Sequence, residues 1–513
     1  MLATSTVVGQ NTDVTFDPEV RYSRALIDAR INDFYANKKQ MGLNVYDASG
    51  NLLKQNAGGS NLKFDYVPGL VAKAIIEAAE YYAGEEFAKP WFYSVQDYAN
   101  RFLGSVPTVG GSLDDLNATK MYATLYDLTL EGGFYAAIAD SETHDNASQA
   151  MAKATQGLKD SKKNYSIKSS VSEEAAGGWY HKKSYPNQMW LDGQYMGPAL
   201  LAQLIEHGHT MEGVEEDWRT ITLQMDITWR YLWDADKKLL WHAFSADPTG
   251  SYAQTWADPV TWHSQEYWGR ACGWYVLALV DILSIMPDGI EMVPIQSSLD
   301  AYPTDCRARL KRYLELVCEG LAERQDPETG CWYQLLAHDG TFFANRYNGK
   351  NYNDTYNYLE SSASSIFTAA FLKGVRLGLL SEEIYLPLAE KAYQGLVNQF
   401  VKLQADGTYT LVNCCASAGL GGSSYRDGSA AYYLLGSDVT RVTTYTEGKV
   451  FGSFILASVE YERLKDRQAS ALKSPGLSNG LTYSYDLNGC KVQNKVDSSL
   501  YIEKGKKKMK VRK

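Results

Sequence analysis

The sequence predicts an all-α fold in which helical hairpins are arranged as a toroid. Apolar residues recur every three to four positions from about residue 18 to residue 465, which is the period of a helix with one buried face. Stretches rich in Gly, Pro and Asp separate these segments and are typical of turns between helices. Several predicted helices are apolar on nearly every side, which favours an inner ring of helices enclosed by an outer ring.

The length of the chain bears on how such helices are organised. With 513 residues the chain exceeds the size at which a single core usually stops growing, so two or three domains would be the ordinary expectation. A toroid of about a dozen helices instead explains a single domain of roughly 450 residues. An α-solenoid is the competing arrangement, and it is less favoured because the sequence has no fixed repeat period.

The helices can be placed in chain order from the spacing of their apolar residues. That spacing predicts helices that pass through residues 70–82, 191–205, 274–286 and 366–377. Turns are predicted where Gly, Pro and Asp gather, at residues 58–59, 110–111, 247–250, 326–330 and 419–422. Strand-like alternation is short and local, as at residues 408–412.

Composition divides the chain into three parts. We expect a flexible N-terminus over residues 1–17, one helical domain over 18–469, and a C-terminal tail over 470–513. Residues 141–180 are polar and rich in Lys and Ser, which predicts an insertion that forms a lid or surface excursion, or else a plain solvated loop. In the tail, two short β-like runs around Asn488-Gly489 predict a small hairpin, with a disordered basic segment as the alternative.

The composition also narrows the classes of function. Aromatic residues make up 12% of the chain, and their rings serve as stacking platforms in carbohydrate pockets, although a Tyr-rich core is the alternative. A net charge of −10 argues against a nucleic-acid partner. No apolar run approaches the ~20 residues that a membrane span needs. The sequence leaves the oligomeric state open.

Histidines and cysteines give no pattern typical of a metal site. The seven Cys residues include no C-x-x-C pair, and neither a disulfide framework nor a zinc signature is indicated. His207 and His209 form the one close histidine pair, and their surroundings are typical of a helix that ends at Gly208. We therefore expect no metal and no organic cofactor.

Residues 179–196 are dense in functional residue types. A Pro-Asn joint at 186–187 leads into the start of an apolar helix, with Asp192 in its first turn. An acidic residue is favoured at that position by helix capping alone. Trp190 and the apolar neighbours would also desolvate the carboxylate and raise its pKa, which a general acid acting near neutral pH requires.

A second dense segment covers residues 264–274. Trp268 and Trp274 flank Arg270, with glycines on both sides that allow a ligand to approach the backbone. Arginine is suited to bidentate recognition of a carboxylate, and tryptophan to stacking on a sugar ring. The alternative is an arginine stacked inside a turn of the core.

Together these segments resemble glycoside hydrolase family 105, the unsaturated rhamnogalacturonyl hydrolases. Family 88, the unsaturated glucuronyl hydrolases, is a more distant likeness. The matching blocks lie at residues 181–196, 266–274, 359–365 and 448–457, and the likeness runs from about Tyr66 to Leu464. The resemblance implies an (α/α)6 toroid and an anionic oligosaccharide as substrate. Cys272 is a departure, because relatives often have Asn at that position.

The resemblance also implies roles for individual residues. Asp192 matches the general acid/base, and Asp114, preferred over Asp115, matches a second carboxylate of the pocket. The side chains expected to bind substrate, including the Trp beside the acid, are His181, His242, Arg270, Trp268, Trp274, Tyr66 and Trp190.

The implied reaction is hydration of the C4=C5 double bond that a pectin lyase leaves on the terminal uronic acid. One carboxylate serves as acid and then as base, so the two-carboxylate spacing of ordinary glycosidases is not required. Three alternatives stay open. They are the same hydration on glycosaminoglycan or ulvan fragments, an inverting glycosidase with Asp114, Asp115 or Glu266 as base, and a glycan-binding toroid without catalysis.

The two ends of the chain bear on where the protein acts. The first residues lack the charged and long apolar regions of a signal peptide. The C-terminal tail resembles the sorting segments of bacterial enzymes exported by the type nine system. We therefore expect a periplasmic or secreted bacterial protein.

Overall fold

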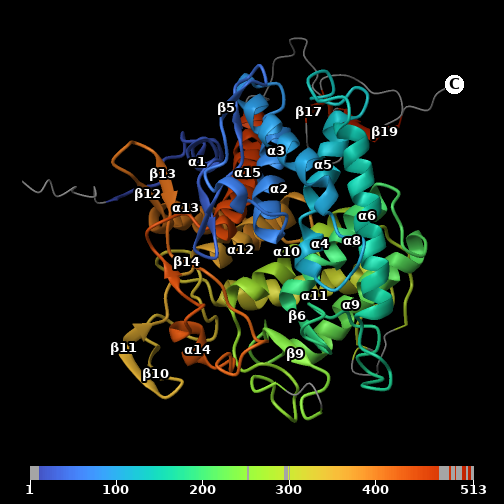
Figure 1. The fold of residues 1–513 in the computed structure, drawn as a ribbon, viewed down its shortest axis with the longest axis vertical. Helices are drawn as coiled ribbons and strands as arrows, with labels where there is room; N and C mark the ends of the chain where they lie inside the picture. The colour runs from blue at the N-terminus through green and yellow to red at the C-terminus, as the bar shows by residue number, and fades with distance from the viewer. Residues whose placement is uncertain are drawn as a thin grey trace, which may run out of the picture.

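The computed structural model describes residues 11–250, 254–293, 299 and 301–472, together with strand residues 484–486, 491–492, 500–503 and 506–509. Two concentric rings of helices form the body of this part of the chain (Figure 1). The inner ring consists of α2 (Tyr66–Tyr81), α5 (Lys120–Thr129), α8 (Pro198–Glu206), α10 (Gly269–Ile285), α12 (Ser361–Arg376) and α15 (Gly448–Leu472). The outer ring consists of α1 (Tyr22–Arg30), α3 (Lys89–Phe102), α6 (Thr143–Asn164), α9 (Val214–Leu232), α11 (Cys306–Glu323) and α13 (Glu382–Phe400).

The rings close because the last inner helix packs on the first. Each inner helix contacts the next one in chain order, and α15 contacts both α12 and α2 (Figure 1). Outer and inner helices alternate along the chain, so each pair forms a hairpin. This arrangement is the predicted (α/α)6 toroid.

Burial explains which helices are inside. Every residue of α10 from Gly269 to Leu283 is buried, as expected for a helix surrounded on all sides. The outer helix α3 buries one face, with Trp91, Val95 and Tyr98 turned to the core. In the described part of the chain, no helix combines the length and the apolar character needed to cross a bilayer.

Short helices and strands connect the hairpins. The remaining short helices are η1 (Gly59–Asn61), η2 (Glu86–Ala88), η3 (Leu103–Ser105), α4 (Leu113–Asn117), α7 (Leu191–Met196) and α14 (Ala430–Leu435). Strands of the body are β1 (Thr12–Asp13), β2 (Phe34–Ala36), β3 (Lys39–Met41), β4 (Val45–Tyr46), β5 (Leu52–Lys54), β6 (Gln188–Trp190), β7 (Trp233–Asp234), β8 (Leu239–Leu240), β9 (Ala243–Ser245), β10 (Phe343–Tyr347), β11 (Lys350–Tyr356), β12 (Val401–Leu403), β13 (Tyr409–Leu411), β14 (Cys414–Cys415) and β15 (Arg441–Val442).

The helices predicted from apolar spacing are found in α2, α10 and α12. The predicted helix at 191–205 is divided into α7 and α8. The break falls at Gly197 and Pro198, because proline has no backbone N–H to continue the hydrogen-bond ladder of the preceding helix. The division gives Asp192 a separate short helix.

The prediction of a surface insertion at residues 141–180 is wrong for most of that range. Residues 143–164 form α6, an outer helix of 22 residues that packs on α5 and α8. Its buried face is made largely of small residues such as Ala147, Ala150 and Ala154.

The ends of the domain are also more ordered than the sequence predicts. Residues 1–10 lie outside the described part, but Thr12 and Asp13 pair with β12. Phe16 packs against the rings of Tyr22 and Tyr393, so the predicted flexibility is wrong from residue 11 onward.

The C-terminal tail contains the predicted short β structure. Strands β16 (Ser484–Asp486), β17 (Lys491–Val492), β18 (Leu500–Glu503) and β19 (Lys506–Met509) form one sheet in the order β17-β16-β18-β19. The antiparallel pairing of β16 with β17 is the predicted hairpin, and its turn at residues 488–489 lies outside the described residues.

All inner helices run in the same direction, so their N-terminal ends meet at one end of the ring, the N-terminal face. The first turns of α2, α7, α10 and α15 begin with Tyr66, Leu191, Gly269 and Gly448. Unpaired N–H groups and aligned helix dipoles make such a face favourable for anions.

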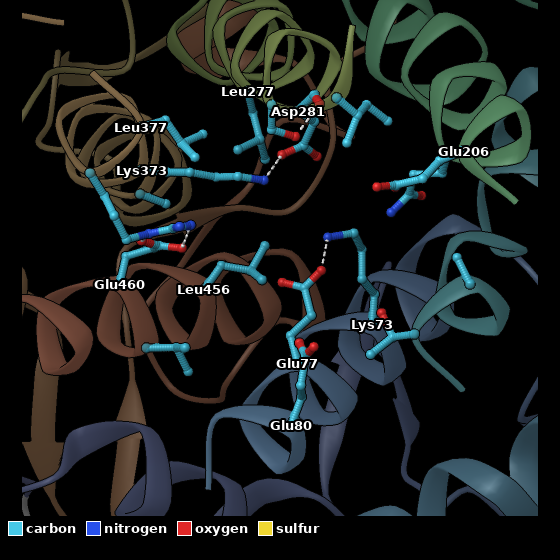
Figure 2. Close-up of a pocket in the computed structure, with 18 of the residues that line it drawn as sticks. Lys73, Glu77, Glu80, Glu206, Leu277, Asp281, Lys373, Leu377, Leu456 and Glu460 are labelled. Carbon is cyan, nitrogen blue, oxygen red and sulfur yellow. Dashed lines mark hydrogen bonds and ion pairs between the residues drawn. The ribbon is translucent and has the colours of Figure 1, made fainter. Parts of the chain in front are cut away.

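The C-terminal ends of the same helices surround a cavity of about 170 Å³. Ion pairs between neighbouring helices line it, as Figure 2 shows for Lys373 with Asp281 at 2.6 Å. Lys73 pairs with Glu77 on α2, and Arg376 of α12 pairs with Glu460 of α15. Ion pairs therefore join the helices at this end of the ring, whereas the N-terminal face carries the predicted site residues.

Candidate active site

Asp192 lies in the first turn of α7, directly after β6. Strand β6 pairs with β9, and the Leu191 N–H donates to the carbonyl oxygen of His242, 3.0 Å away. This pairing brings the two side chains together although 50 residues separate them in sequence. Asp192 Oδ2 lies 3.1 Å from His242 Nε2.

The pKa of Asp192 differs from the sequence-based expectation. Burial raises the pKa of this carboxyl group, as its apolar neighbours predict. The hydrogen bond that Asp192 accepts from His242, together with the positive charge of Arg270, outweighs burial and holds the pKa below its usual value. The prediction of a raised pKa is therefore wrong for the free protein, in which Asp192 is ionised at neutral pH.

His181 and Asp114 form a second cluster on the same face. His181 Nε2 lies 3.4 Å from Asp114 Oδ1, and Lys182 Nζ lies 2.6 Å from Asp114 Oδ2. Asp114 is buried, whereas Asp115 is exposed. The backbone N–H of Asp115 donates to Ser112 Oγ, which caps α4. The structure thus brings Asp114, the preferred residue, to the cluster.

One nitrogen of His181 has no hydrogen-bond partner in the described residues. This atom is Nδ1, and the side chain that carries it is buried. Burial lowers the pKa of His181, so the imidazole is neutral at neutral pH. A buried polar atom without a partner is unfavourable unless something binds there.

Aromatic rings enclose the two histidines. The rings of His181 and Tyr185 each stack on Trp190, with centroids 4.7 and 5.2 Å away, and His242 meets Trp190 edge-on. Trp268 lies beside His242, with centroids 4.9 Å apart. These rings surround the Asp192–His242 pair and leave 14% of the Asp192 side chain exposed.

Trp274 is not part of this cluster. It stacks on Tyr195, with ring centroids 4.8 Å apart, one helical turn deeper in the ring than Arg270. The predicted substrate-binding role of Trp274 is therefore not supported by its position. Cys272, the departure from the family pattern, is also fully buried.

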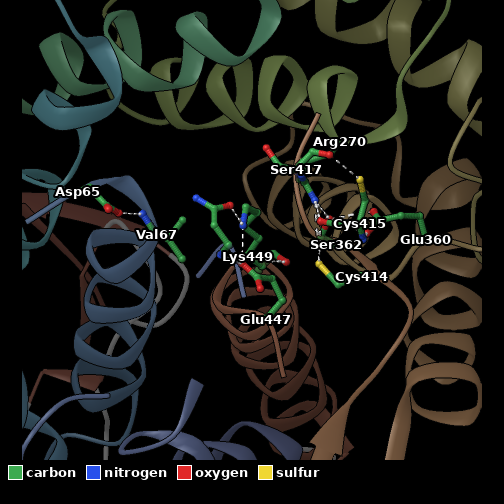
Figure 3. A network of polar contacts seen from close by, with 12 residues as sticks. Asp65, Val67, Arg270, Glu360, Ser362, Cys414, Cys415, Ser417, Glu447 and Lys449 are labelled. Carbon is green, nitrogen blue, oxygen red and sulfur yellow. Dashed lines mark hydrogen bonds and ion pairs between the residues drawn. The ribbon is translucent and has the colours of Figure 1, made fainter. Parts of the chain in front are cut away.

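Arg270 is buried at the start of α10 and anchored by backbone and side-chain groups (Figure 3). Its Nη1 donates to the carbonyl oxygen of Cys415 at 2.5 Å and to Ser362 Oγ at 3.2 Å. The guanidinium lies 4.6 Å from the ring centre of Trp268. Glu360, which accepts from Ser362 and from the Cys415 N–H, holds the same groups from the other side.

Tyr66, the first residue of α2, also lies at this face. Burial raises its pKa well above the usual value, and Arg270, Asp114 and Asp192 are close enough to affect it. A fully buried ion pair between Lys449 and Glu447 lies at the start of α15 (Figure 3). Asp65 caps α2 by accepting a hydrogen bond from the Val67 N–H at 2.9 Å. The positive charge of Lys449 acts on the Asp65 carboxyl group.

Sequence reasoning missed several of these groups. Glu360 and Lys449 stand inside blocks that carry the family resemblance, but no role was inferred for them. Tyr433 of α14 gives no signal in its Tyr-rich segment, yet its Oη lies 2.7 Å from His242 Nδ1. The 191 positions between these two residues explain why no local pattern connects them.

Known proteins are similar to this chain over most of its length. The sequence profile described as Glycosyl Hydrolase Family 88 matches residues 49–465. A solved structure of a glycoside hydrolase from family 105 of C. acetobutylicum ATCC 824 is 27% identical, with a TM-score of 0.60. The match covers 86% of this chain and 99% of that one.

Two further proteins are similar. A structure from Salmonella enterica serovar Paratyphi A, whose name calls it a possible member of the GH105 family, is 19% identical with a TM-score of 0.54. It covers 88% of this chain and 97% of its own, and supports the fold alone. Protein Atu3128 of Agrobacterium fabrum is 32% identical over 231 residues, which are 42% of this chain and 84% of that protein.

Proposed function

The chain belongs to glycosyl hydrolase family 88, and we propose that it removes a 4,5-unsaturated uronic acid from the non-reducing end of lyase-generated rhamnogalacturonan oligosaccharides. The observation that carries this proposal is the pairing of Asp192 with the buried His242 at the N-terminal face. The choice of rhamnogalacturonan rests on the resemblance of the sequence blocks to family 105 and on the 27% identity to a family 105 hydrolase.

The positive character of the N-terminal face suits the uronate carboxylate. Arg270 contributes a buried positive charge, and the converging helix N-termini contribute partial positive charges and N–H donors. The unpartnered Nδ1 of His181 is an atom that can accept a hydrogen bond from a sugar hydroxyl. The chain as a whole carries −10, so binding of an anion depends on this local field.

Binding of the substrate also prepares the acid. In the free protein, the positive surroundings hold Asp192 ionised. A bound uronate brings a negative charge into the same surroundings, which offsets their effect and raises the pKa of Asp192. Asp192 therefore takes up a proton together with the substrate, and becomes the general acid in the complex.

The reaction then follows from the chemistry of the double bond. Asp192 gives its proton to C4, and the electron pair of the C4=C5 bond forms the new C–H bond, which leaves oxocarbenium character at C5. Water attacks C5 and loses a proton to the Asp192 carboxylate. The C5 hemiketal opens, C1 becomes a hemiacetal that expels the second sugar, and the uronate leaves as a keto acid.

A direct inverting mechanism is less favoured by the contacts of the other carboxylates. Such a mechanism needs a second carboxylate free to activate water opposite Asp192. Asp114 is occupied by Lys182 and His181, and Glu266 lies 3.2 Å from His338 Nε2. Hydration by one acid/base group does not need either of them.

The substrate can be tested by ultraviolet absorbance of the unsaturated bond. Oligosaccharides from a rhamnogalacturonan lyase and from a glycosaminoglycan lyase are mixed separately with the protein. We expect absorbance to fall with the first substrate and to persist with the second. Loss with the glycosaminoglycan product alone would move the assignment to unsaturated glucuronyl substrates. Binding of both without loss of absorbance would instead indicate a glycan-binding protein.

The paired substitutions Asp114→Asn and Asp115→Asn test the second carboxylate. We expect Asp114→Asn to lower kcat/KM about tenfold or more, because Lys182 and His181 lose a charged partner inside the site. Asp115→Asn should stay within about twofold, since that side chain is exposed. Equal effects of the two substitutions on steady-state kinetics would contradict the assignment to Asp114.

A further inference from the structure

A buried hydroxyl group lies behind the acid pair, on the side of His242 away from Asp192. The hydroxyl belongs to Tyr433 of α14. We infer that Tyr433 is a positioning residue that holds His242 in the tautomer with its proton on Nε2, and thereby determines which oxygen of Asp192 carries the catalytic proton. The inference rests on the proposed function for its kinetic consequence, but the tautomer itself does not depend on the substrate.

The position of Tyr433 is fixed by its surroundings. The side chain is fully buried, and its ring stacks on Trp268 with centroids 6.1 Å apart. The neighbouring ring of Tyr432 lies 5.1 Å away. The carbonyl oxygen of Tyr433 accepts a hydrogen bond from Gln334 Nε2 at 3.4 Å. The hydroxyl group is thus held 2.7 Å from His242 Nδ1.

The hydrogen bonds around His242 can be assigned from what each atom is able to do. An ionised Asp192 carboxylate only accepts, so His242 Nε2, 3.1 Å away, must carry the proton. In a neutral imidazole Nδ1 is then an acceptor, and Tyr433 must donate to it. Burial raises the pKa of Tyr433 well above its usual value, helped by the charges of Glu266 and Asp192, so the phenol keeps its proton.

The opposite arrangement leaves a buried group unsatisfied. If Nδ1 carried a proton, Tyr433 would have to accept from it and turn its own O–H elsewhere. In the residues that the structure describes, Tyr433 Oη has no hydrogen-bond partner besides His242. A buried donor without an acceptor costs about 1–3 kcal/mol, which favours the tautomer with the Nε2 proton.

This tautomer has a consequence for the acid. Because His242 Nε2–H donates to Oδ2, and the carbonyl oxygen of a carboxylic acid is a better acceptor than its hydroxyl oxygen, a protonated Asp192 favours its proton on Oδ1. With the other tautomer, the bare Nε2 would accept a proton from Oδ2, and the acid would point at His242 and not at the sugar. Tyr433 therefore acts through His242 on the direction of the catalytic proton.

Several titratable groups that bear on a pH profile face the Asp192–His242 pair and Tyr433. Asp192 is affected by His242, His181 and Arg270. Tyr433 is affected by Tyr432, Glu266, Asp192 and Cys415. Removing only the Tyr433 hydroxyl leaves each of these charged groups in place.

The experiment compares Tyr433→Phe with Tyr432→Phe in the full chain. Tyr432 is the matched control, because it precedes Tyr433 in α14 and its hydroxyl bonds to Gly419 instead of His242. We expect Tyr433→Phe to lower kcat about tenfold or more with KM within about twofold, and to change the shape of the pH profile of kcat. Tyr432→Phe should leave kcat, KM and the pH profile of kcat unchanged. Thermal unfolding of the two variants checks that each one folds.

A measurement on the unsubstituted protein tests the tautomer directly. Nitrogen NMR of ¹⁵N-histidine-labelled protein, with His242 identified by its loss in His242→Gln, should show the proton on Nε2. A proton on Nδ1, or normal kcat and pH profile in Tyr433→Phe, would overturn the inference. Absence of turnover by the unsubstituted protein on every unsaturated uronide would overturn the proposed function, while the NMR result would still decide the role of Tyr433.

Discussion

Replacing Asp192 with asparagine is expected to lower kcat on an unsaturated uronide on the order of 10³–10⁴-fold. Asparagine has nearly the same shape, and its amide oxygen can still accept the hydrogen bond from His242 Nε2, so the fold should be kept. The amide can neither give a proton to C4 nor take one from water. Because one group serves both steps, no other carboxylate is placed to replace it.

The measurement is the loss of ultraviolet absorbance under single-turnover conditions, with binding followed separately by calorimetry. We expect Asp192→Asn to bind the oligosaccharide while failing to consume it. Asp115→Asn, an exposed carboxylate on the same face, is the control with the same change of charge. Near-normal kcat in Asp192→Asn would contradict the assigned acid and the hydration mechanism with it.

The second large effect is expected at the opposite end of the ring. Asp281 is buried in α10 and pairs with Lys373 at 2.6 Å. Lys73 and Lys120 also lie close enough to lower its pKa. Asp281→Asn leaves these ammonium groups without their shared anion, which we expect to lower the free energy of unfolding by about 3 kcal/mol. Denaturant unfolding at neutral pH measures this loss in the free energy of unfolding.

The pH dependence of stability should change in the same variant. Burial raises the pKa of Asp281, but Lys373, Lys73 and Lys120 outweigh it and lower the pKa from 3.8 to about 2. A carboxyl group with a lowered pKa in the folded state stabilises the fold above its unfolded pKa and loses that contribution as the pH falls. We therefore expect the contribution of Asp281 to be complete above about pH 4 and to disappear toward about pH 2.

Asp288→Asn provides the control for both measurements. Asp288 pairs with Arg307 at 3.3 Å, but its side chain is 91% exposed, so the substitution should change stability by about 0.5 kcal/mol or less. If Asp281→Asn were as stable as the unsubstituted protein at neutral pH, the ion pairs around the cavity would not hold this end of the ring together.

The helices that sequence analysis placed correctly are those with a local signal. In α2, α10 and α12, large apolar residues at helical spacing predict both the helix and its burial. Helix α6 was missed because Ala147, Ala150 and Ala154 form its buried face, and small residues among many polar ones do not produce a strong pattern. Its packing on α5 and α8 comes from tertiary contacts that spacing does not reveal.

The site was predictable where its residues share a segment, and not where they meet through the fold. His181 and Asp192 stand in one motif, and both lie at the N-terminal face. The sign of the Asp192 pKa shift could not be derived from Trp190 and other neighbours, because distant residues such as His242 and Arg270 decide it. Trp274 follows Arg270 by one helical turn, and that turn carries it into the interior.

The packing of α15 on α2 also has a consequence for synthesis of the chain on the ribosome. Until residues 448–472 emerge, a nascent chain holds an open arc, with the apolar sides of α2 and α12 uncovered. The contacts between α2 and α15 join residues 66–81 with residues 448–472, and contacts of such large sequence separation form late. Closure of the inner ring must therefore wait until residues 448–472 have been synthesised, and until then the arc exposes apolar surface of the kind that favours aggregation.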